Sequence, residues 1–296
     1  MSAPLRSILF VPGDSGRKLE KSLGFGADAL MIDLEDSVVP ARKPVARELA
    51  AAFLHANSAS PGVRIWVRVN PLGSEDILPD LAAIVGAKPA GILLPKSEGA
   101  ADVRRLSHYL DALEAREGLA NGSTRIMAIA TETAAATFAL GEYRGAGMER
   151  LCALTWGAED LSADIGASTN RDPDGRLSLT YRMVRSNLLL AAKAAGVMAI
   201  DTAYPDYRDL VALHEALEVS RREGFSGALA IHPAQIEPMN AAFSPSEEDI
   251  RLAEKIVAAF SADPDAGTLG IDGRMYDRPH LVQAQKILAM RDAFDA

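Results

Sequence analysis

The chain has 296 residues, of which 48% are hydrophobic, which is enough to bury one large core. Its formal charge is −9 with acidic and basic residues interspersed, so we expect no basic surface for nucleic acid. The one cysteine, Cys152, excludes an internal disulfide and a cysteine-rich metal site, and we interpret it as a small buried hydrophobic residue.

The N-terminal residues lead directly into a strand-like run, without a signal-peptide pattern or an Arg/Ser-rich transit pattern. No apolar run approaches the ~18 residues that a membrane-spanning helix needs. We therefore expect a soluble, cytoplasmic protein that has no membrane partner.

Short apolar runs of β type alternate with longer amphipathic stretches along most of the chain. The strand-like runs are 7–12, 29–36, 64–70, 91–96, 125–132, 150–157, 198–204 and 227–233. Apolar residues recur near the helical period between them, most clearly in 41–57, 100–118, 181–196 and 207–224. This alternation predicts parallel strands that are connected by helices.

Eight strand–helix units over about 240 residues have the usual size of a (β/α)8 barrel. The predicted fold is therefore an α/β TIM barrel over residues 1–243. A doubly wound open sheet is the alternative, because sequence does not show whether a sheet closes. No G-x-G-x-x-G or G-x-x-x-x-G-K-[ST] loop follows any strand, so neither a dinucleotide site nor a P-loop is indicated.

Residues 244–296 are predicted to form a helical extension that the barrel does not need. A helix over 244–262 opens with a Ser/Glu capping pattern, and a last amphipathic helix runs to about Ala293. The Gly/Asp-rich segment 263–280 between them is predicted to be a flexible loop. We expect this extension to be either a lid over the barrel mouth or an arm that reaches a neighbouring subunit.

Active sites of (β/α)8 barrels lie at the C-terminal ends of the strands. The polar residues at these ends are Asp33, Glu35, Asp36, Arg68, Asn70, Lys96, Glu132, Glu159, Asp160, Asp201, Tyr204 and His232. Carboxylates dominate this set. Clustered negative charge at a barrel mouth is costly unless cations balance it.

A Mg²⁺ ion is one such cation, because it prefers oxygen ligands and is held by one or two carboxylates together with water and substrate oxygens. Glu132 and Asp160 are the predicted ligands, since they end neighbouring strands and small residues flank both. The acids of residues 33–36 are expected to hold metal-bound waters from across the barrel. The alternative is a network of salt bridges and helix caps, in which Asp36 and Thr133 are N-caps.

Arg68 lies in a strand that is otherwise built for burial, and its planar guanidinium suits a carboxylate. Its alternative partner is an acid of the second strand. A cation beside an arginine describes a site for a small carboxylate with an adjacent hydroxyl or carbonyl oxygen, where an enolate or oxyanion is stabilised. Lys96 is interpreted as an ion-pair partner rather than a Schiff-base lysine, and His232 is given a structural role.

Nine segments, in chain order, resemble the citrate lyase β-subunit-like proteins of the HpcH/HpaI aldolase superfamily, which includes malyl-CoA and citramalyl-CoA lyases. They are "LFVPG", "GADALMIDLEDSV", "VRVN", "GILLPK", "ATET", "WGAEDLSADIG", "AIDTAY", "IHPAQI" and "GRMYDRPH", and they span Leu9 to His280. The combination of "DLEDSV" with "GAEDLSADIG" is the specific part of the resemblance.

The resemblance implies a (β/α)8 barrel with a C-terminal extension, assembled as a homotrimer or hexamer, that uses Mg²⁺ to make or break a carbon–carbon bond between an acyl-CoA enolate and a keto acid. It makes Glu132 and Asp160 the metal ligands and Arg68 the residue that binds the substrate carboxylate. It also places Glu35 and Asp36 around the metal ligands.

Two further roles follow from the resemblance. Asp277 of an adjacent subunit is expected to be the acid/base at the methyl carbon of acetyl-CoA. For CoA itself, the segment "GDSGRKLEK" offers Arg17 and Lys18, with Lys21, to the phosphates. Tyr276 stands where many relatives have an aliphatic residue, and it is expected to alter how the lid packs on the acyl group.

We therefore expect a Mg²⁺-dependent lyase that splits a malyl-, citramalyl- or citryl-type CoA thioester into acetyl-CoA and a keto acid. The alternatives are a citrate lyase β subunit that acts on an acyl carrier protein, a pyruvate aldolase that does not use CoA, and a non-catalytic binding subunit. Hydrolysis of the product thioester after cleavage also remains open.

Overall fold

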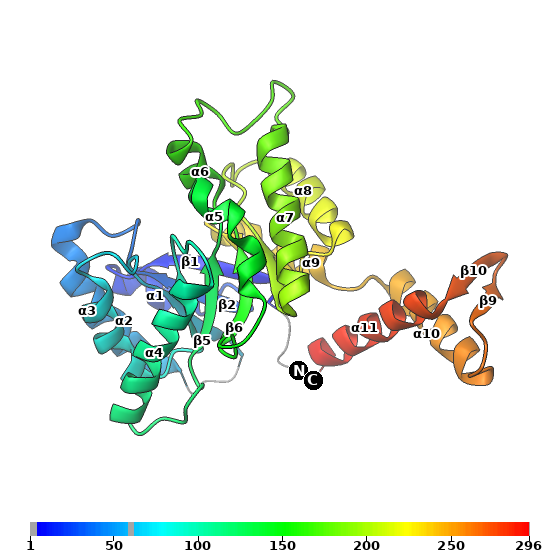
Figure 1. Cartoon of the computed structure of the whole chain (residues 1–296), viewed down its shortest axis with the longest axis horizontal. Coiled ribbons are helices and arrows are strands. Elements are labelled where there is room, and N and C mark those ends of the chain that lie inside the picture. Colours follow the sequence, from blue (N-terminus) through cyan, green and yellow to red (C-terminus); the bar gives the residue numbers. More distant parts are fainter. Residues whose placement is uncertain (1–4, 59–61, 296) are drawn as a thin grey trace.

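The computed structural model describes residues 5–58 and 62–295. Eight parallel strands pair in chain order, and the eighth returns to the first, so the sheet is a closed barrel surrounded by helices (Figure 1). The strands are β1 (Ser7–Pro12), β2 (Ala29–Asp33), β3 (Arg64–Arg68), β4 (Gly91–Leu94), β5 (Arg125–Ile129), β6 (Leu151–Thr155), β7 (Met198–Asp201) and β8 (Gly227–Ala230). The predicted (β/α)8 barrel is confirmed, and the open sheet is excluded.

The strands from β2 to β8 end before the predicted runs do. β2, for example, ends at Asp33 rather than at residue 36, and β5 ends at Ile129 rather than at residue 132. The residues between leave the sheet and turn into the loops at the barrel mouth. Their side chains are therefore free to face the mouth instead of alternating between the two faces of the sheet.

The helices cover the outside of the barrel. They are α1 (Gly16–Ser22), α2 (Lys43–Asn57), α3 (Ile77–Ile84), α4 (Ala100–Arg116), α5 (Ala134–Phe138), α6 (Ala158–Asp164), α7 (Leu179–Ala195), α8 (Leu210–Glu223) and α9 (Ile236–Phe243). The four predicted amphipathic stretches are confirmed as α2, α4, α7 and α8. Their apolar faces, with Leu54, Leu106 and Leu188 buried, form the larger core against the strands.

A second core fills the barrel interior and includes Met31, Trp66, Leu93 and Met127. A Cβ atom at Gly91 would lie 2.2 Å from the Trp66 ring, so only glycine fits beside this indole. Because the interior is packed rather than hollow, chemistry is confined to the mouth. Cys152 is partly buried against this core rather than fully buried as expected. The loss of surrounding water raises the pKa of its thiol to about 11.

Arg150 and Glu114 form a buried ion pair beneath the barrel. The Arg150 guanidinium donates to both Glu114 oxygens, at 2.8 and 2.6 Å, and the backbone N–H groups of Gly122 and Thr124 donate to the same carboxylate. Burial alone would raise the pKa of Glu114, but these bonds outweigh it and lower the pKa to about 2. The charged form is therefore the one that stabilises the fold.

Replacing Arg150 by methionine is expected to lower the free energy of unfolding by about 3–5 kcal/mol, because it leaves a buried carboxylate without its cation. Since the pKa of Glu114 is lowered from 4.5 to about 2 in the folded state, the stabilisation is complete above pH 4.5 and is lost as the pH falls toward 2. Urea unfolding at pH 7 and at lower pH measures this. The control Arg116→Met, which breaks an exposed pair with Glu117, should cost less than about 1 kcal/mol. Equal effects of the two substitutions would contradict the prediction.

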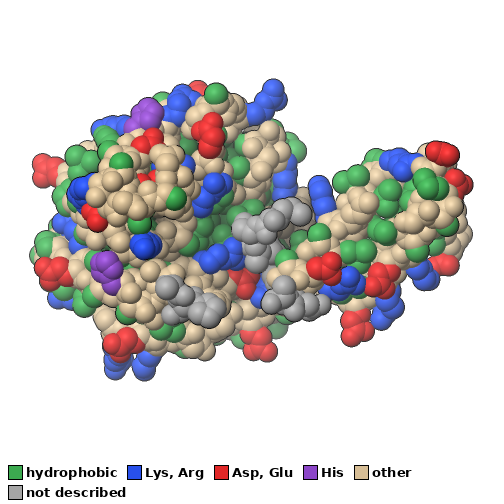
Figure 2. Space-filling model, turned by 90° about the horizontal axis from the view of Figure 1, so that it is seen from below, with side chains coloured by type: hydrophobic (Ala, Val, Ile, Leu, Met, Phe, Trp, Pro, Cys, Tyr) green, Lys and Arg blue, Asp and Glu red, His purple; other side chains and the backbone are tan. Residues whose placement is uncertain are grey.

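The C-terminal residues form an arm that projects to one side of the barrel in two perpendicular views (Figures 1 and 2). It consists of α10 (Glu247–Ala262), β9 (Thr268–Ile271), β10 (Arg274–Asp277) and α11 (Arg278–Asp295). Ala253, Ile256, Phe260, Tyr276 and Ala284 form a small core within it. Tyr276 is thus buried inside the arm, edge-on to His280, and its expected effect on how the lid packs on the acyl group stays a prediction.

The prediction of a flexible loop over 263–280 was wrong, because this segment contains the β9–β10 hairpin. Its turn residues, Asp272 and Gly273, both have positive φ, at 48° and 77°. An Asp-Gly pair between two strands is the usual signal for such a turn, and it is present in "GIDGRM". The predicted helix before it is confirmed as α10, where Ser246 and Asp249 form a capping box.

The face of the molecule seen in Figure 2 shows acidic and basic side chains interspersed over both the barrel and the arm. None of the helices in residues 5–58 and 62–295 is long and apolar enough to cross a membrane.

Candidate functional site

Arg68 and Asp33 lie opposite each other on neighbouring strands and form a bidentate ion pair at the mouth. The register of β2 and β3 pairs the two residues directly. Nε and Nη2 of Arg68 each lie 2.7 Å from an Asp33 oxygen. The alternative interpretation, in which Arg68 pairs with an acid of the second strand, is therefore realised in the single chain.

The acids that follow Asp33 complete the surroundings of this guanidinium. Nη1 of Arg68 lies 3.0 Å from Glu35 Oε2 and 3.3 Å from Asp36 Oδ2. Burial would raise the pKa of Asp33, but hydrogen bonds and charge from Arg68 lower it below its usual value. Burial does raise the pKa of Glu35, although Arg68 opposes the shift. In the single chain, these three acids are therefore counter-ions of the Arg68 guanidinium.

The turn is fixed by hydrogen bonds to the backbone. Asp33 accepts from the N–H groups of Glu35 and Ser37, at 2.9 and 3.0 Å. The carbonyl oxygen of Leu34 accepts from Asn70 Nδ2 at 3.0 Å. Asn70 also donates to the buried carboxylate of Asp80. Its side chain therefore fixes the position of the turn and is not available to a substrate at the mouth.

Lys96 links the two sides of the site. It follows β4 with a positive φ of 50°, and its backbone N–H donates to Glu132 Oε2. Its Nζ lies 2.7 Å from Glu35 Oε1 and 3.7 Å from Asp160 Oδ1. Burial would lower the pKa of Lys96, but the bond to Glu35 raises it, so the side chain is a cation among acids. The predicted ion-pair role is confirmed.

Glu132 is buried beside other acids. Burial, followed by the charges of Asp160 and Glu35, raises its pKa to about 8. Asp160 lies in the first turn of α6 and is half-exposed, and its charge is near enough to act on Glu132 from the neighbouring strand end. A buried carboxylate whose charge is disfavoured by its neighbours requires a nearby cation to remain ionised.

Gly157 makes room for the Glu132 side chain. A Cβ atom at this position would lie 2.8 Å from Glu132 Cγ, closer than carbon atoms normally approach. The sequence shows that small residues flank both acids, but it does not show this particular contact, which depends on how β5 and β6 lie against each other. Gly157 is therefore part of the site.

Several other candidate residues turn out to support the structure. Glu159 accepts a hydrogen bond from Asn170 at 2.8 Å. His232 accepts from the N–H of Ala234 and stacks on Tyr207, which confirms its structural role. Thr133 caps α5, as one alternative predicted.

Asp277 is not brought to this site by the single chain. It lies on β10 of the arm, away from the barrel mouth (Figure 1). Its carboxylate contacts His280 Nδ1 at 2.5 Å, and this hydrogen bond lowers its pKa. With the arm in this position, Asp277 would take part in barrel chemistry only at the mouth of another copy.

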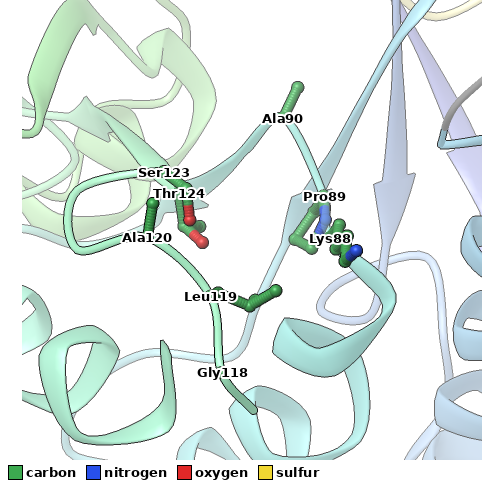
Figure 3. Close-up of a pocket in the computed structure, with 8 residues that line it drawn as sticks. All are labelled: Lys88, Pro89, Ala90, Gly118, Leu119, Ala120, Ser123 and Thr124. Atoms are coloured by element: carbon green, nitrogen blue, oxygen red, sulfur yellow. The ribbon is translucent and has the colours of Figure 1, made fainter. Parts of the chain in front are cut away.

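Arg17 and Lys18 are exposed at the start of α1, directly after the β1 loop at the mouth. Their proposed contact with CoA phosphates stays a prediction. The pocket in Figure 3 lies at the other end of the barrel, because the loops that line it, 88–90 and 118–124, lead into β4 and β5. It is separate from the acidic mouth.

In the part of the chain that the structure describes, no three His, Cys, Asp or Glu side chains converge as a set of metal ligands. If Glu132 and Asp160 held a cation, its other ligands would be water and substrate oxygens. This is the usual arrangement for Mg²⁺ rather than for Zn²⁺.

Curated proteins with similar sequences cover nearly the whole chain. A (3S)-malyl-CoA thioesterase of Cereibacter sphaeroides is 35% identical, covering 99% of this chain and 96% of its own length. A citrate lyase subunit beta of Haemophilus influenzae is 33% identical, with 96% and 95% covered.

Solved structures are similar over the same length. The protein CitE of Mycobacterium tuberculosis, in complex with magnesium, acetoacetate and coenzyme A, has a TM-score of 0.79 and 32% identity, with 98% of each chain covered. A comparison with models of protein families matches residues 6–233 to HpcH/HpaI aldolase/citrate lyase. The resemblance seen in the motifs is confirmed: this chain belongs to the HpcH/HpaI aldolase/citrate lyase family.

Proposed function

We propose that this protein is a Mg²⁺-dependent carbon–carbon lyase that cleaves or forms a 3-hydroxyacyl-CoA thioester such as malyl-, citramalyl- or citryl-CoA. Cleavage yields acetyl-CoA and a keto acid, and the reverse reaction joins them. The observation that carries the proposal is the pair of carboxylates, Glu132 and Asp160, beside the Arg68 guanidinium at the barrel mouth. The relatives support it, since their names and complexes include malyl-CoA, citrate lyase, magnesium and coenzyme A.

The residues present fit a magnesium ion. Glu132 is buried, and its charge is disfavoured by Asp160 and Glu35, so a divalent cation between Glu132 and Asp160 would relieve the repulsion. When bound, Mg²⁺ would supply positive charge near the keto oxygen, where negative charge develops during bond cleavage. Glu132 and Asp160 would hold it.

Arg68 is assigned to the substrate carboxylate. Asp33 occupies the Nε–Nη2 edge of the guanidinium and fixes its plane. Nη1 contacts Asp36, whose side chain is 55% exposed and therefore easily displaced. A keto-acid carboxylate would replace Asp36 at this edge with better geometry.

The remaining assignments concern the thioester. Arg17 and Lys18, exposed beside the mouth, would bind the phosphates of CoA. Asp277 from the arm of a neighbouring copy would exchange a proton with the methyl carbon of acetyl-CoA, within a homotrimer or hexamer. Its carboxylate is ionised at neutral pH and would accept a proton in the direction of bond formation.

The test is a screen of malyl-, citramalyl-, citryl- and hydroxymethylglutaryl-CoA with and without Mg²⁺, in which keto acid and free thiol are measured separately. Keto acid without thiol supports the proposed lyase. Keto acid from the free hydroxy acids would indicate an aldolase that does not need CoA, and turnover of acyl-carrier-protein thioesters alone would indicate a citrate lyase β subunit. No Mg²⁺-dependent product from any of these substrates would contradict the proposal.

A second candidate is hydrolysis of malyl-CoA, because a 35% identical relative is named a (3S)-malyl-CoA thioesterase. Hydrolysis would release thiol and malate without keto acid. Thiol that appears together with keto acid would instead indicate cleavage followed by hydrolysis of acetyl-CoA. The same assay therefore separates the two activities.

Replacing Gly157 by alanine is expected to weaken Mg²⁺ binding by about tenfold or more, because the new Cβ forces Glu132 out of position. Isothermal titration with Mg²⁺ measures this. Gly141→Ala is the matched control, since a Cβ there meets nothing within 4 Å and its φ is not positive. If Gly157→Ala bound Mg²⁺ as tightly as Gly141→Ala, the assignment of Glu132 as a ligand would be wrong.

A further inference from the structure

The strand β6, which precedes the Asp160 loop, pairs with β7 over fewer residues than with β5. Toward β5, backbone bonding continues to the end of β6, where the N–H of Ala130 donates to Thr155 at 2.9 Å. Toward β7, the registered pairs are Ala153 with Met198 and Leu154 with Ala199. The end of β6 therefore extends beyond its ladder with β7.

One side-chain hydrogen bond bridges these two strand ends. Trp156 Nε1 donates to Asp201 Oδ1 at 2.7 Å, and both side chains are buried. It joins the residue that follows β6 to the last residue of β7, beyond the registered pairs of the two strands. Trp156 directly precedes Gly157, which contacts Glu132, and α6 with Asp160 begins one residue later.

Asp201 is a firm acceptor for this bond. Arg185 of α7 donates to it through Nε and Nη2, with the shortest contact 2.7 Å. Ser220 of α8 donates at 2.5 Å, and the N–H of Thr202 donates at 2.9 Å. A carboxylate held from two helices and its own strand has little freedom to move, so the indole that it holds is also fixed.

We propose that Trp156 and Asp201 are positioning residues for the metal site: the indole hydrogen bond clamps the end of β6, so that Gly157 and the first turn of α6 present Asp160 beside Glu132. Neither residue touches substrate. The effect on metal binding rests on the proposed function, in which Glu132 and Asp160 hold Mg²⁺, whereas the clamping of residues 156–164 is a property of the fold alone.

The chain offers a matched control for this inference. Trp156→Phe removes the indole N–H but keeps an aromatic ring. Trp66→Phe removes the same atoms from the other tryptophan, which is equally buried but whose Nε1 has no hydrogen-bond partner. The two variants lose similar volume, so a difference between them at residues 156–164 reports the hydrogen bond.

The experiment has two readouts on the intact protein. Hydrogen exchange of the peptide that covers residues 156–164 should be about fivefold to tenfold faster in Trp156→Phe than in Trp66→Phe. Mn²⁺ affinity, measured from the free-ion EPR signal, should fall about tenfold in Trp156→Phe and change less than about twofold in Trp66→Phe.

The outcomes separate the two proposals. Unchanged exchange in Trp156→Phe, relative to Trp66→Phe, would overturn the clamp whatever the metal result. Faster exchange with unchanged Mn²⁺ affinity would overturn the positioning role. If the unmodified protein bound no Mn²⁺, the proposed function would fail, while the exchange comparison would still decide whether the indole bond clamps β6.

Discussion

Replacing Glu132 by glutamine is expected to lower kcat/KM for thioester cleavage by at least about 10³-fold, equivalent to about 4 kcal/mol of transition-state stabilisation. Glutamine has the shape of glutamate and keeps an oxygen that accepts the Lys96 N–H. It removes only the negative charge that the proposed Mg²⁺ ion needs. The measurement is steady-state cleavage of the best thioester substrate, compared with the unmodified protein.

The variant also separates loss of metal from loss of fold. Because burial and neighbouring acids raise the pKa of Glu132 to about 8, a neutral amide costs the metal-free fold less than a carboxylate does. The Tm in the presence of a chelator should therefore not fall. Added Mg²⁺ should raise the Tm of the unmodified protein but not that of Glu132→Gln, since a ligand stabilises only the form that binds it.

Glu159→Gln is the control for this prediction. Glu159 lies next to Asp160 in α6, but its side chain bonds to Asn170 outside the site, and glutamine keeps the accepting oxygen. Its activity should stay within about threefold of the unmodified protein, as expected for a substitution away from the reacting groups. A Glu132→Gln variant with the activity of this control would refute the metal assignment.

The barrel was predictable from the sequence because its signal is repeated. Alternating strand-like and helical patterns specify eight parallel strands, and parallel strands place all their C-terminal ends at one edge. That geometry alone brings Glu132, Asp160, Arg68 and the acids after β2 to a single mouth. The list of strand-end residues therefore already contained the charged groups of the candidate site, although not Gly157.

The partners of those residues were less predictable, because they depend on distances across the mouth. Asp33 was expected near metal-bound water, whereas it forms a bidentate pair with Arg68. Asp201 is at a strand end as well, but its side chain lies outside the barrel, where it binds Trp156 and Arg185. Position along the chain gives the edge of the sheet, and packing of the loops decides which way each side chain turns.

The role of the arm is harder to predict from one sequence, since the role proposed for Asp277 involves a neighbouring subunit. It has a core of its own, and its hairpin carries Asp277 away from the barrel of the same chain (Figure 1). Glu132 and Arg68 lie at the mouth, so one chain presents the two halves of the proposed catalytic set separately. In the proposed function, a head-to-tail contact joins these halves, so that the arm of one subunit serves the barrel of the next.

Asp277→Ala is therefore expected to lose exchange of the acetyl-CoA methyl protons by at least about 10²-fold, as for removal of a general acid or base, while Mg²⁺ binding is retained. Mixing it with Glu132→Gln tests where Asp277 acts. An Asp277→Ala subunit keeps an intact barrel, and a Glu132→Gln subunit keeps an intact arm. Each variant alone should be inactive, but a site that joins the first barrel to the second arm should work.

Random assembly of the two variants in equal amounts should restore about one quarter of the full activity in the unfractionated mixture, since half of the barrels are intact and half of the arms that reach them are intact. In trimers that carry both tags the expected value rises to about one third, because the inactive trimers of a single variant are removed. Co-expression of two differently tagged chains, followed by purification through both tags, provides the mixed assemblies. Recovery well above the sum of the separate variants requires a site shared between subunits. If the mixed assemblies stayed inactive while Asp277→Ala alone lost proton exchange, Asp277 would have to act on the barrel of its own chain, and the arm would have to fold back onto the mouth during the reaction.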